Sequence, residues 1–355
     1  MKKSRFVLYL LLLFALLGIG VGLWVQFQRG GYEERWIRID AKIEREVSES
    51  TFPVLQESTR KVGFLLFALQ GEKLLEIPFD TPLDKLPQKL RQMFSHQGVK
   101  VHKINTQNLK GRYEVLMKLG WENKITHILR FILKKKKVAL LVDDFGYSNG
   151  PVVKAFLDEL DIPLTISIIP GTPYANPVAE KAYKQKKEIV VHLPMQPQQE
   201  FKGSYRWIVL EEMPESKINK LVREAIEDVP HARGLNNHMG SLITTQEKPM
   251  RAVLEVIKRK NLYFVDSRSS HNSVAFSLAR RMGVKSARND SFLDNYKEIE
   301  YIKERFYSHL ESVKSGGGSV AICHSTLTTA RAIKEIVSGL ERRKVELVFV
   351  SELVE

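Results

Sequence analysis

The stretch Lys137-Val-Ala-Leu-Leu-Val-Asp-Asp-Phe-Gly146 decides the fold of this chain. Five apolar residues, Val138 to Val142, run directly into two carboxylates and a glycine. This pattern predicts a buried strand that carries Asp143 and Asp144 at its C-terminal end. Adjacent aspartates at such a place repel one another, which favours a bound cation or a shared proton that offsets the repulsion. A polar turn in which Asp144 caps the next helix fits the strand alone equally well.

β-rich runs and helical segments alternate regularly from Val138 to Val350. Such alternation is typical of a parallel sheet that is covered by helices on both faces and is closed, or nearly closed, into a barrel. We therefore predict an α/β fold over residues 135–355, a (β/α)7-8 barrel, with the chemistry at the carboxyl ends of its strands. The four lysines from Lys134 to Lys137 form a natural boundary before it.

Polar and turn-forming residues collect at the ends of the predicted strands. They are Asp143 and Asp144 after the first strand, Ile169-Pro170-Gly171 after the second, His192 after the third, Asn236 to Ser241 after the fourth, Asp266-Ser267-Arg268 after the fifth, Arg288-Asn289-Asp290 after the sixth and His324-Ser325 after the seventh. One histidine at a strand end is structural at least as often as it is a ligand. Three histidines from separate strands beside a double aspartate favour a shared site.

Metal chemistry explains this set of side chains. Aspartate oxygen and histidine nitrogen suit zinc, manganese, iron or cobalt, and two histidines with one carboxylate leave positions open for water and substrate. We predict that Asp144, His192 and His238 bind a divalent metal, with Zn²⁺ preferred. Asp143 would then be the general base beside a metal-bound water, and His324 would protonate the leaving group from the other side.

The single cysteine, Cys323, limits the alternatives. It permits no intrachain disulfide and no thiolate cluster, so any metal must be held by His, Asp and Glu. Val320, Ile322 and His324 share one face of the last predicted strand, which places Cys323 on the opposite face. Cys323 is therefore expected to be a packing residue rather than a nucleophile.

The composition is that of a folded protein with a basic balance. The 355 residues are 43% hydrophobic and 27% charged. Lys and Arg number 55 against 41 Asp and Glu, a net charge of +14, which suits an anionic surface such as phospholipid head groups, acidic polymer or nucleic acid. No zinc finger, helix-turn-helix or aromatic RNA-binding pattern accompanies the charge, so no nucleic-acid partner is expected.

The N-terminal residues predict a membrane anchor. Lys2, Lys3 and Arg5 precede an uncharged run from Phe6 to Phe27, which as a helix of about 1.5 Å per residue spans the roughly 30 Å hydrocarbon core of a lipid bilayer. A cleaved signal peptide is the alternative, but no Ala-x-Ala site follows the run. Residues 1–29 would form a cytoplasmic tail and a single-pass inner-membrane helix, which places everything after Arg29 on the periplasmic or extracytoplasmic side.

Residues 30–134 predict a stalk and a small α+β membrane-proximal module. Sparse apolar residues near helical spacing between Tyr32 and Ser50 indicate the stalk, and strand-like and helical runs follow it. His96, His102 and His127 are isolated in this region. Surface or packing roles suit them better than catalysis.

From about Lys137 to its C-terminus the chain resembles the divergent polysaccharide deacetylases, a branch of the (β/α)-barrel carbohydrate esterases that remove N- or O-acetyl groups from glycans. Asp143-Asp144-Phe145-Gly146 is similar to the first deacetylase motif, in which the first aspartate is the base and the second binds the metal. Glu188 to His192 is similar to the approach to the second motif, and Ile322-Cys323-His324 to the last, which supplies the acid histidine. Asn237 to Ser241 and Phe264 to Ser267 resemble signatures of the divergent branch.

One position departs from ordinary deacetylases. Their second motif carries another metal-binding histidine four residues after the first, where this chain has Gln196. We expect His238, from the next strand, to take its place. Further candidates for contact with the ligands or the substrate are Asn237, Asp266, Arg268, Arg288 and Asp290. Asp266, Asp290 and Asp294 are alternatives as metal ligands or as hydrogen-bond partners of the ligands. Arg268 and Arg288 could hold an acidic group of the substrate or orient Asp143, and salt bridges between strands suit them equally well.

Two functions follow from these residues. The first is a metal-dependent hydrolase that removes acetyl groups from an N-acetylated envelope polysaccharide, with peptidoglycan amino sugars as the obvious candidates. The second is a catalytically inactive barrel that binds glycan or serves as a cell-envelope scaffold, which Gln196 leaves open. Release of acetate separates the two.

Overall fold

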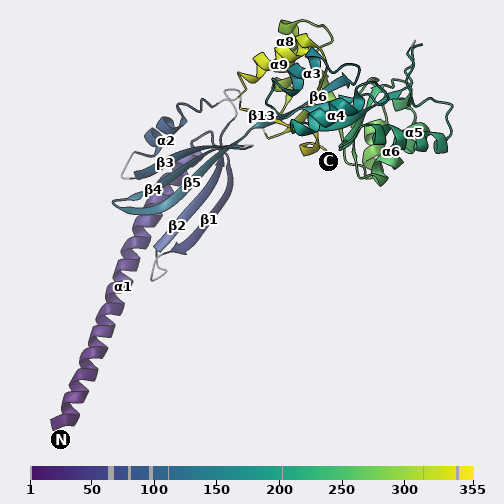
Figure 1. Ribbon diagram of the computed structural model, residues 1–355. Coiled ribbons are helices and arrows are strands. Elements are labelled where there is room, and N and C mark those ends of the chain that lie inside the picture. Colours follow the sequence, from purple (N-terminus) through teal and green to yellow (C-terminus); the bar gives the residue numbers. More distant parts are fainter. Residues whose placement is uncertain are drawn as a thin grey trace. The chain divides into compact units, whose positions relative to one another are not determined.

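The computed structural model describes residues 2–62, 68–78, 81–95, 99–110, 112–201, 203–314, 316–340 and 344–355. The chain divides into two compact units, Met1–Lys134 and Lys135–Glu355 (Figure 1). Each unit has its own hydrophobic core.

The first unit is a five-stranded sheet with two helices. Its elements are α1 (Lys2–Ser48), β1 (Val54–Val62), β2 (Ala68–Glu76), α2 (Leu86–Phe94), β3 (Lys100–Leu109), β4 (Arg112–Trp121) and β5 (Lys124–Lys134). The strands follow the order β1-β2-β5-β4-β3, and β2 and β5 are parallel while the other neighbours are antiparallel.

The C-terminal half of α1 belongs to this module rather than forming a separate stalk. Trp36, Ile39, Ile43 and Val47 are buried in the core that also includes Leu75 of β2. Their spacing of three to four residues puts them on one face of the helix, which is why a polar-looking segment can pack along a sheet. His127 packs here too, because its ring stacks on Trp36 at a centroid distance of 5.0 Å.

The predicted membrane anchor is not supported by this structure. Within the described part of the chain, no helix has a run both long enough and apolar enough to cross a membrane. The stretch from Phe6 to Phe27 lies in α1, and the side chains of residues 2–16 and 27 lie outside those described. His96 also lies outside the described residues.

The second unit is a closed barrel of seven parallel strands. They are β6 (Lys136–Phe145), β7 (Thr165–Ile168), β8 (Glu188–Met195), β9 (Gly234–Met239), β10 (Tyr263–Asp266), β11 (Ser286–Phe292) and β12 (Gly318–His324). Each strand pairs with the next, and β12 pairs with β6, where His324 lies opposite Asp143. A short strand, β13 (Val345–Val348), pairs with Lys136 to Ala139 of β6. β7 pairs with the later residues of β6, from Leu141 to Phe145. The predicted α/β barrel is confirmed.

Seven α-helices of the described residues cover the barrel. They are α3 (Pro151–Leu157), α4 (Ala175–Lys184), α5 (Glu215–Asp228), α6 (Glu247–Arg259), α7 (Ala275–Arg281), α8 (Ile299–Ser312) and α9 (Leu327–Val337). Alternate strand residues pack against these helices or fill the barrel. Val320 and Ile322 lie in the inner cluster and Cys323 in the outer one, as their alternation predicts.

The sixth strand of the barrel is longer than predicted. β11 runs through Asp290 and continues to Phe292, so its carboxyl end carries Asp294 instead of Asp290. The sequence Ser286-Ala-Arg-Asn-Asp-Ser-Phe292 is too polar for hydrophobic periodicity to reveal its length. Parallel pairing with β12 is what extends it.

Candidate metal centre

The layer of the barrel interior nearest the carboxyl ends of the strands is polar. Below it, the inward residues Leu141, Val190, Val265 and Ile322 form an apolar plug. The next inward positions toward the carboxyl ends of the strands are polar and buried: Asp143 on β6, Ser167 on β7, His192 on β8, Asn236 on β9, Ser267 after β10 and Asn289 on β11. Side chains alternate between the two faces of each strand, so the positions that fill the apolar core are followed by polar side chains that point to the same place inside the barrel.

A local break in β6 brings both aspartates to this point. In a regular strand, neighbouring side chains face opposite sides of the sheet. Asp144 instead has φ 69°, and the pairing with β7 is irregular between Val142 and Phe145. Both carboxylates consequently approach His192: Asp143 Oδ1 lies 3.6 Å from Nδ1 and Asp144 Oδ1 lies 3.3 Å from Nε2. A left-handed non-glycine residue at such a place is characteristic of functional sites.

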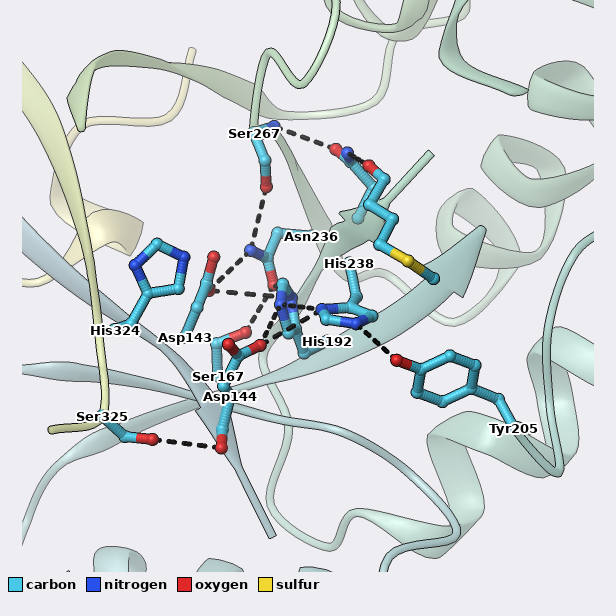
Figure 2. Close-up of polar contacts among 12 residues, drawn as sticks. Asp143, Asp144, Ser167, His192, Tyr205, Asn236, His238, Ser267, His324 and Ser325 are labelled. Atoms are coloured by element: carbon cyan, nitrogen blue, oxygen red, sulfur yellow. Dashed lines mark hydrogen bonds and ion pairs between the residues drawn. The ribbon is translucent and has the colours of Figure 1, made fainter. Parts of the chain in front are cut away.

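The three predicted ligands meet in a small triangle (Figure 2). Oδ1 of Asp144 lies 3.3 Å from Nε2 of His192 and 3.1 Å from Nδ1 of His238, and the two nitrogens are 3.0 Å apart. A tetrahedral metal with bonds of about 2.0–2.1 Å needs ligand atoms about 3.3 Å apart, and an octahedral one needs about 3.0 Å. The edges of the triangle therefore match a metal of this size.

Hydrogen bonds on the far side of each ring direct a lone pair into the triangle. Asn236 Nδ2 donates to Asp143 Oδ1 at 2.9 Å, so its Oδ1 is left to accept from His192 Nδ1 at 3.0 Å and from Ser167 Oγ at 2.6 Å. The proton on Nδ1 leaves Nε2 of His192 as a free ligand atom.

Tyr205 does the same for His238. Its hydroxyl lies 2.9 Å from His238 Nε2. Ligation through Nδ1 places the proton on Nε2, which then donates to the Tyr205 oxygen. Two imidazole lone pairs and a carboxylate oxygen thus face one another, and Oδ1 of Asp144 is buried without a hydrogen-bond partner among the described residues. A proton can bridge only two of these atoms, whereas a metal ion satisfies all three.

The charges of the ligands support this arrangement. Burial by itself would raise the pKa of Asp144, but its contacts with the two imidazoles hold it below its ordinary value. Burial, together with the neighbouring His192, lowers the pKa of His238, which keeps this imidazole neutral and able to bind a metal. Burial also opposes a charge on His192, but the two aspartates raise its pKa, so a metal that binds here would have to displace the proton from Nε2 of that ring. The Asp144 side chain is 36% exposed while His192 is 3% exposed. The Asp144 side chain therefore reaches a cavity at the surface, although its Oδ1 is itself buried.

Asp143 lies behind the triangle and is almost fully buried. Burial raises the pKa of its carboxyl, and the negative charge of Asp144 adds to the effect, while His192 and the Asn236 amide oppose it. Asn236 also donates to Ser267 Oγ at 3.1 Å, which fixes the amide that holds Asp143.

His324 faces Asp143 from β12 (Figure 2). Its Nδ1 lies 2.8 Å from Oδ1 of Asp294, and its backbone N–H donates to Oδ2 of the same carboxylate at 2.8 Å. Asp294 is buried and also accepts from Thr329 Oγ1. The hydrogen bond that His324 donates to Asp294 raises the pKa of His324 to about 9. His324 is therefore a cation at neutral pH, and its ring is 38% exposed.

A cavity of about 620 Å³ opens over Asp144 and His324. Its other lining residues include Ser148, Lys297 and Thr326. Around it, three tyrosines are exposed on the loops that follow β6, β7 and β11: Tyr147 by 55%, Tyr174 by 43% and Tyr296 by 65%. Exposed aromatic rings beside a polar cavity suit a ligand with both hydroxyl groups and flat apolar faces.

Two predicted candidates have structural roles instead of contacts with the ligands. Asn237 accepts from Ser267 N–H and donates to the Met239 carbonyl, so it joins the loops after β9 and β10. Asp266 accepts from the Arg268 and Phe276 N–H groups and from Ser273 Oγ. Both of its oxygens accept hydrogen bonds, and Asp266 is not among the described residues whose ligand atoms converge on the triangle.

Among the described residues, the remaining predicted candidates form no hydrogen bond or ion pair with the three ligands. Arg268 and Arg288 are exposed, and the Arg288 guanidinium lies over the Phe276 ring. Asp290 accepts from the Val320 N–H, near the start of β12. Gln196, at the position of the missing histidine, accepts from the Glu211 N–H through its side chain and so holds the loop after β8.

Sequence reasoning missed three residues of the site. Asn236 lies among the residues after the fourth predicted strand but received no role, and its period-two spacing from Gly234 was the available signal. Asp294 is among the predicted alternatives as a ligand or as a partner of the ligands, but its role beside His324 was missed because the predicted sixth strand ends before Asp290. Tyr205 comes from an irregular loop, where no periodicity points toward a site.

Comparison with known proteins shows which family this chain resembles. The model of the divergent polysaccharide deacetylase family matches residues 140–354, more than half of the chain. Uncharacterized protein YibQ of Escherichia coli is 33% identical over 209 residues, which cover 58% of this chain and 63% of YibQ. An uncharacterized protein of Haemophilus influenzae is 31% identical over 204 residues, which cover 58% of this chain and 72% of the relative. The chain thus matches somewhat less than two thirds of the length of YibQ.

A solved structure shares the fold. The crystal structure of uncharacterized protein ATU2773 from Agrobacterium tumefaciens superposes with a TM-score of 0.58 at 16% identity and covers 66% of this chain and 91% of that one. At this identity the likeness concerns the fold alone.

Proposed function

Because this chain belongs to the divergent polysaccharide deacetylase family, we propose that its barrel is a metal-dependent hydrolase that removes acetyl groups from an N-acetylated polysaccharide. The observation that carries the proposal is the triangle of Asp144, His192 and His238, which lies next to the buried carboxylate of Asp143, with the cationic His324 beside that carboxylate. These three residues would hold the metal, with Zn²⁺ expected first. When bound, the metal would polarise the acetyl carbonyl and acidify water.

Asp143 is suited to be the general base. Burial raises the pKa of its carboxyl, and the carboxylate is therefore a stronger proton acceptor than an exposed aspartate. The Asn236 amide holds Oδ1, which fixes the carboxylate next to Asp144. A water molecule that attacks the carbonyl can give its proton to Asp143.

His324 is suited to be the general acid. Its pKa of about 9 keeps the imidazolium form at neutral pH, and Asp294 occupies Nδ1, so Nε2 carries the proton that can be donated. Donation to the nitrogen of the departing amino sugar lets the C–N bond break and leaves acetate and a free amine. Base and acid come from paired positions on the neighbouring strands β6 and β12.

The surroundings of the site support a glycan substrate. The cavity over Asp144 and His324 is lined by the hydroxyl groups of Ser148, Ser325 and Thr326. Sugar rings have hydroxyl edges and flat C–H faces, and the three exposed tyrosines around the cavity offer surfaces for such faces.

Release of acetate from metal-loaded protein tests the proposal. N-acetylchitohexaose and peptidoglycan fragments would be supplied as substrates. The Asp143→Asn variant should lose about 10²–10⁴-fold in rate, because the amide cannot accept the proton. Asp290→Asn is the matched control, since Asp290 is exposed and bonds only the backbone of Val320. If the wild type binds these glycans and releases no acetate, the barrel is the inactive glycan-binding protein instead.

We also propose, from the sequence, that the N-terminal residues hold the barrel outside the cytoplasmic membrane. Leu17, Val21 and Trp24 are exposed on α1, which is consistent with a lipid-facing helix. Protease added to spheroplasts should then degrade the barrel. Recovery of the intact protein in the soluble fraction would refute this location.

A further inference from the structure

A second cavity lies beside two helices of the barrel. It measures about 760 Å³ and lies between α3 and α9, which pack side by side (Figure 1). The lining residues of the two cavities are neighbours in the chain: Ser148 is followed by Asn149, and Thr326 by Leu327. The groove therefore leads away from Asp144 and His324 along two fixed helices.

The charge of this groove is positive. Lys154, Lys181, Arg331 and Lys334 line it, against Asp158 and Glu159. Lys181 pairs with Asp158 at 2.7 Å and Lys334 lies 3.7 Å from Glu159, so both acids are already balanced. Lys154 and Arg331 have no ion-pair partner among the described residues and are exposed.

A third cation lies nearer the site. Lys297 lines the first cavity beside His324, is exposed, and makes no ion pair with a described residue. Unpaired cations thus occur at both ends of the path from the site into the groove. A neutral glycan would gain nothing from them, while a polymer with repeated negative charges could pair with each in turn.

We infer that the groove between α3 and α9 binds an anionic stretch of the polysaccharide whose acetylated sugar occupies the site. The ligand is a glycan that carries carboxylate or phosphate groups on the units flanking the acetylated one. This inference rests on the proposed function for the identity of the ligand as a glycan. It concerns binding, however, and is tested without turnover.

Calorimetric titration of the metal-loaded full chain with Asp143→Asn, which prevents hydrolysis, gives the affinities directly. The three probes are neutral N-acetylchitohexaose, a hyaluronan hexasaccharide with carboxylates, and a phosphorylated chitohexaose. At least one anionic probe should bind about fivefold tighter than the neutral one at about 50 mM salt, and this advantage should shrink at about 300 mM salt because exposed charges are screened. The tighter anionic probe identifies the charged group.

The variants assign the effect to the groove. Lys154→Gln with Arg331→Gln should weaken binding of the preferred anionic probe about three- to tenfold. Lys217→Gln with Arg223→Gln removes the same charge from exposed positions of α5 and should leave binding unchanged. Equal affinities for neutral and anionic probes, or equal losses in the two double variants, would overturn the inference. Failure to release acetate would refute the proposed function while leaving these affinities to decide the groove.

Discussion

The protonation state of His324 is set by one neighbour. Asp294 raises the pKa of His324 to about 9, so the acid form persists through neutral pH and is lost as the pH rises through about 9. The rate of acetate release should therefore fall above about pH 9. In Asp294→Asn this fall in rate at high pH, the basic limb of the pH–rate profile, should move toward about pH 7, since an unperturbed histidine has a pKa of about 6.5. A pH–rate profile unchanged by this substitution would show that another group sets the limb.

Tyr205 should affect the metal more than the chemistry. Removing its hydroxyl in Tyr205→Phe leaves Nε2 of His238 without its recorded partner. Loss of such an outer contact weakens metal binding about 10- to 100-fold, which competition with a chromophoric chelator can measure. Tyr183→Phe is the control, because Tyr183 is exposed on α4 and stacks on His231. Equal metal affinities in the two variants would mean that Tyr205 does not hold the ligand.

At the scale of elements, the turn after β6 depends on Gly146. Its φ is +118°, and an added Cβ would lie 2.1 Å from Thr172 Oγ1. Gly146→Ala should lower the free energy of unfolding by about 2–4 kcal/mol, combining backbone strain with a clash. Gly283→Ala separates the two contributions, because Gly283 also has positive φ but no atom nearer than 3.8 Å, and it should cost only about 1 kcal/mol. Chemical denaturation measures both, and similar costs would exclude a role for the clash.

The elements also show what the sequence could reveal. The apolar run before Asp143 and the alternation along β12 are periodic, so they predicted the barrel and the inward direction of His324. β11 is polar and its length depends on pairing with β12, so the sequence alone did not show that Asp294 follows the carboxyl end of this strand. The carboxylates of Asp143 and Asp144 meet only because of a left-handed residue in a strand, and no sequence period encodes that. The long-range ligand pair, His192 and His238, followed from parallel strands ending at one edge.

At the scale of the whole molecule, the metal centre belongs to one unit. Every described contact of its ligands lies within Lys135–Glu355, which has its own core. A protein of residues 135–355 should therefore bind Zn²⁺ with the affinity of the full chain, as competition with a chelator would show. A loss of more than about tenfold would mean that the first unit stabilises the site.

The most direct measurement is anomalous diffraction at the zinc edge from crystals of the full chain grown with Zn²⁺. One strong peak should lie within about 2.0–2.2 Å of Asp144 Oδ1, His192 Nε2 and His238 Nδ1, and it should be absent from crystals of His238→Ala. A zinc-loaded crystal without a peak at these three atoms, or with a peak that persists in His238→Ala, would contradict the metal centre.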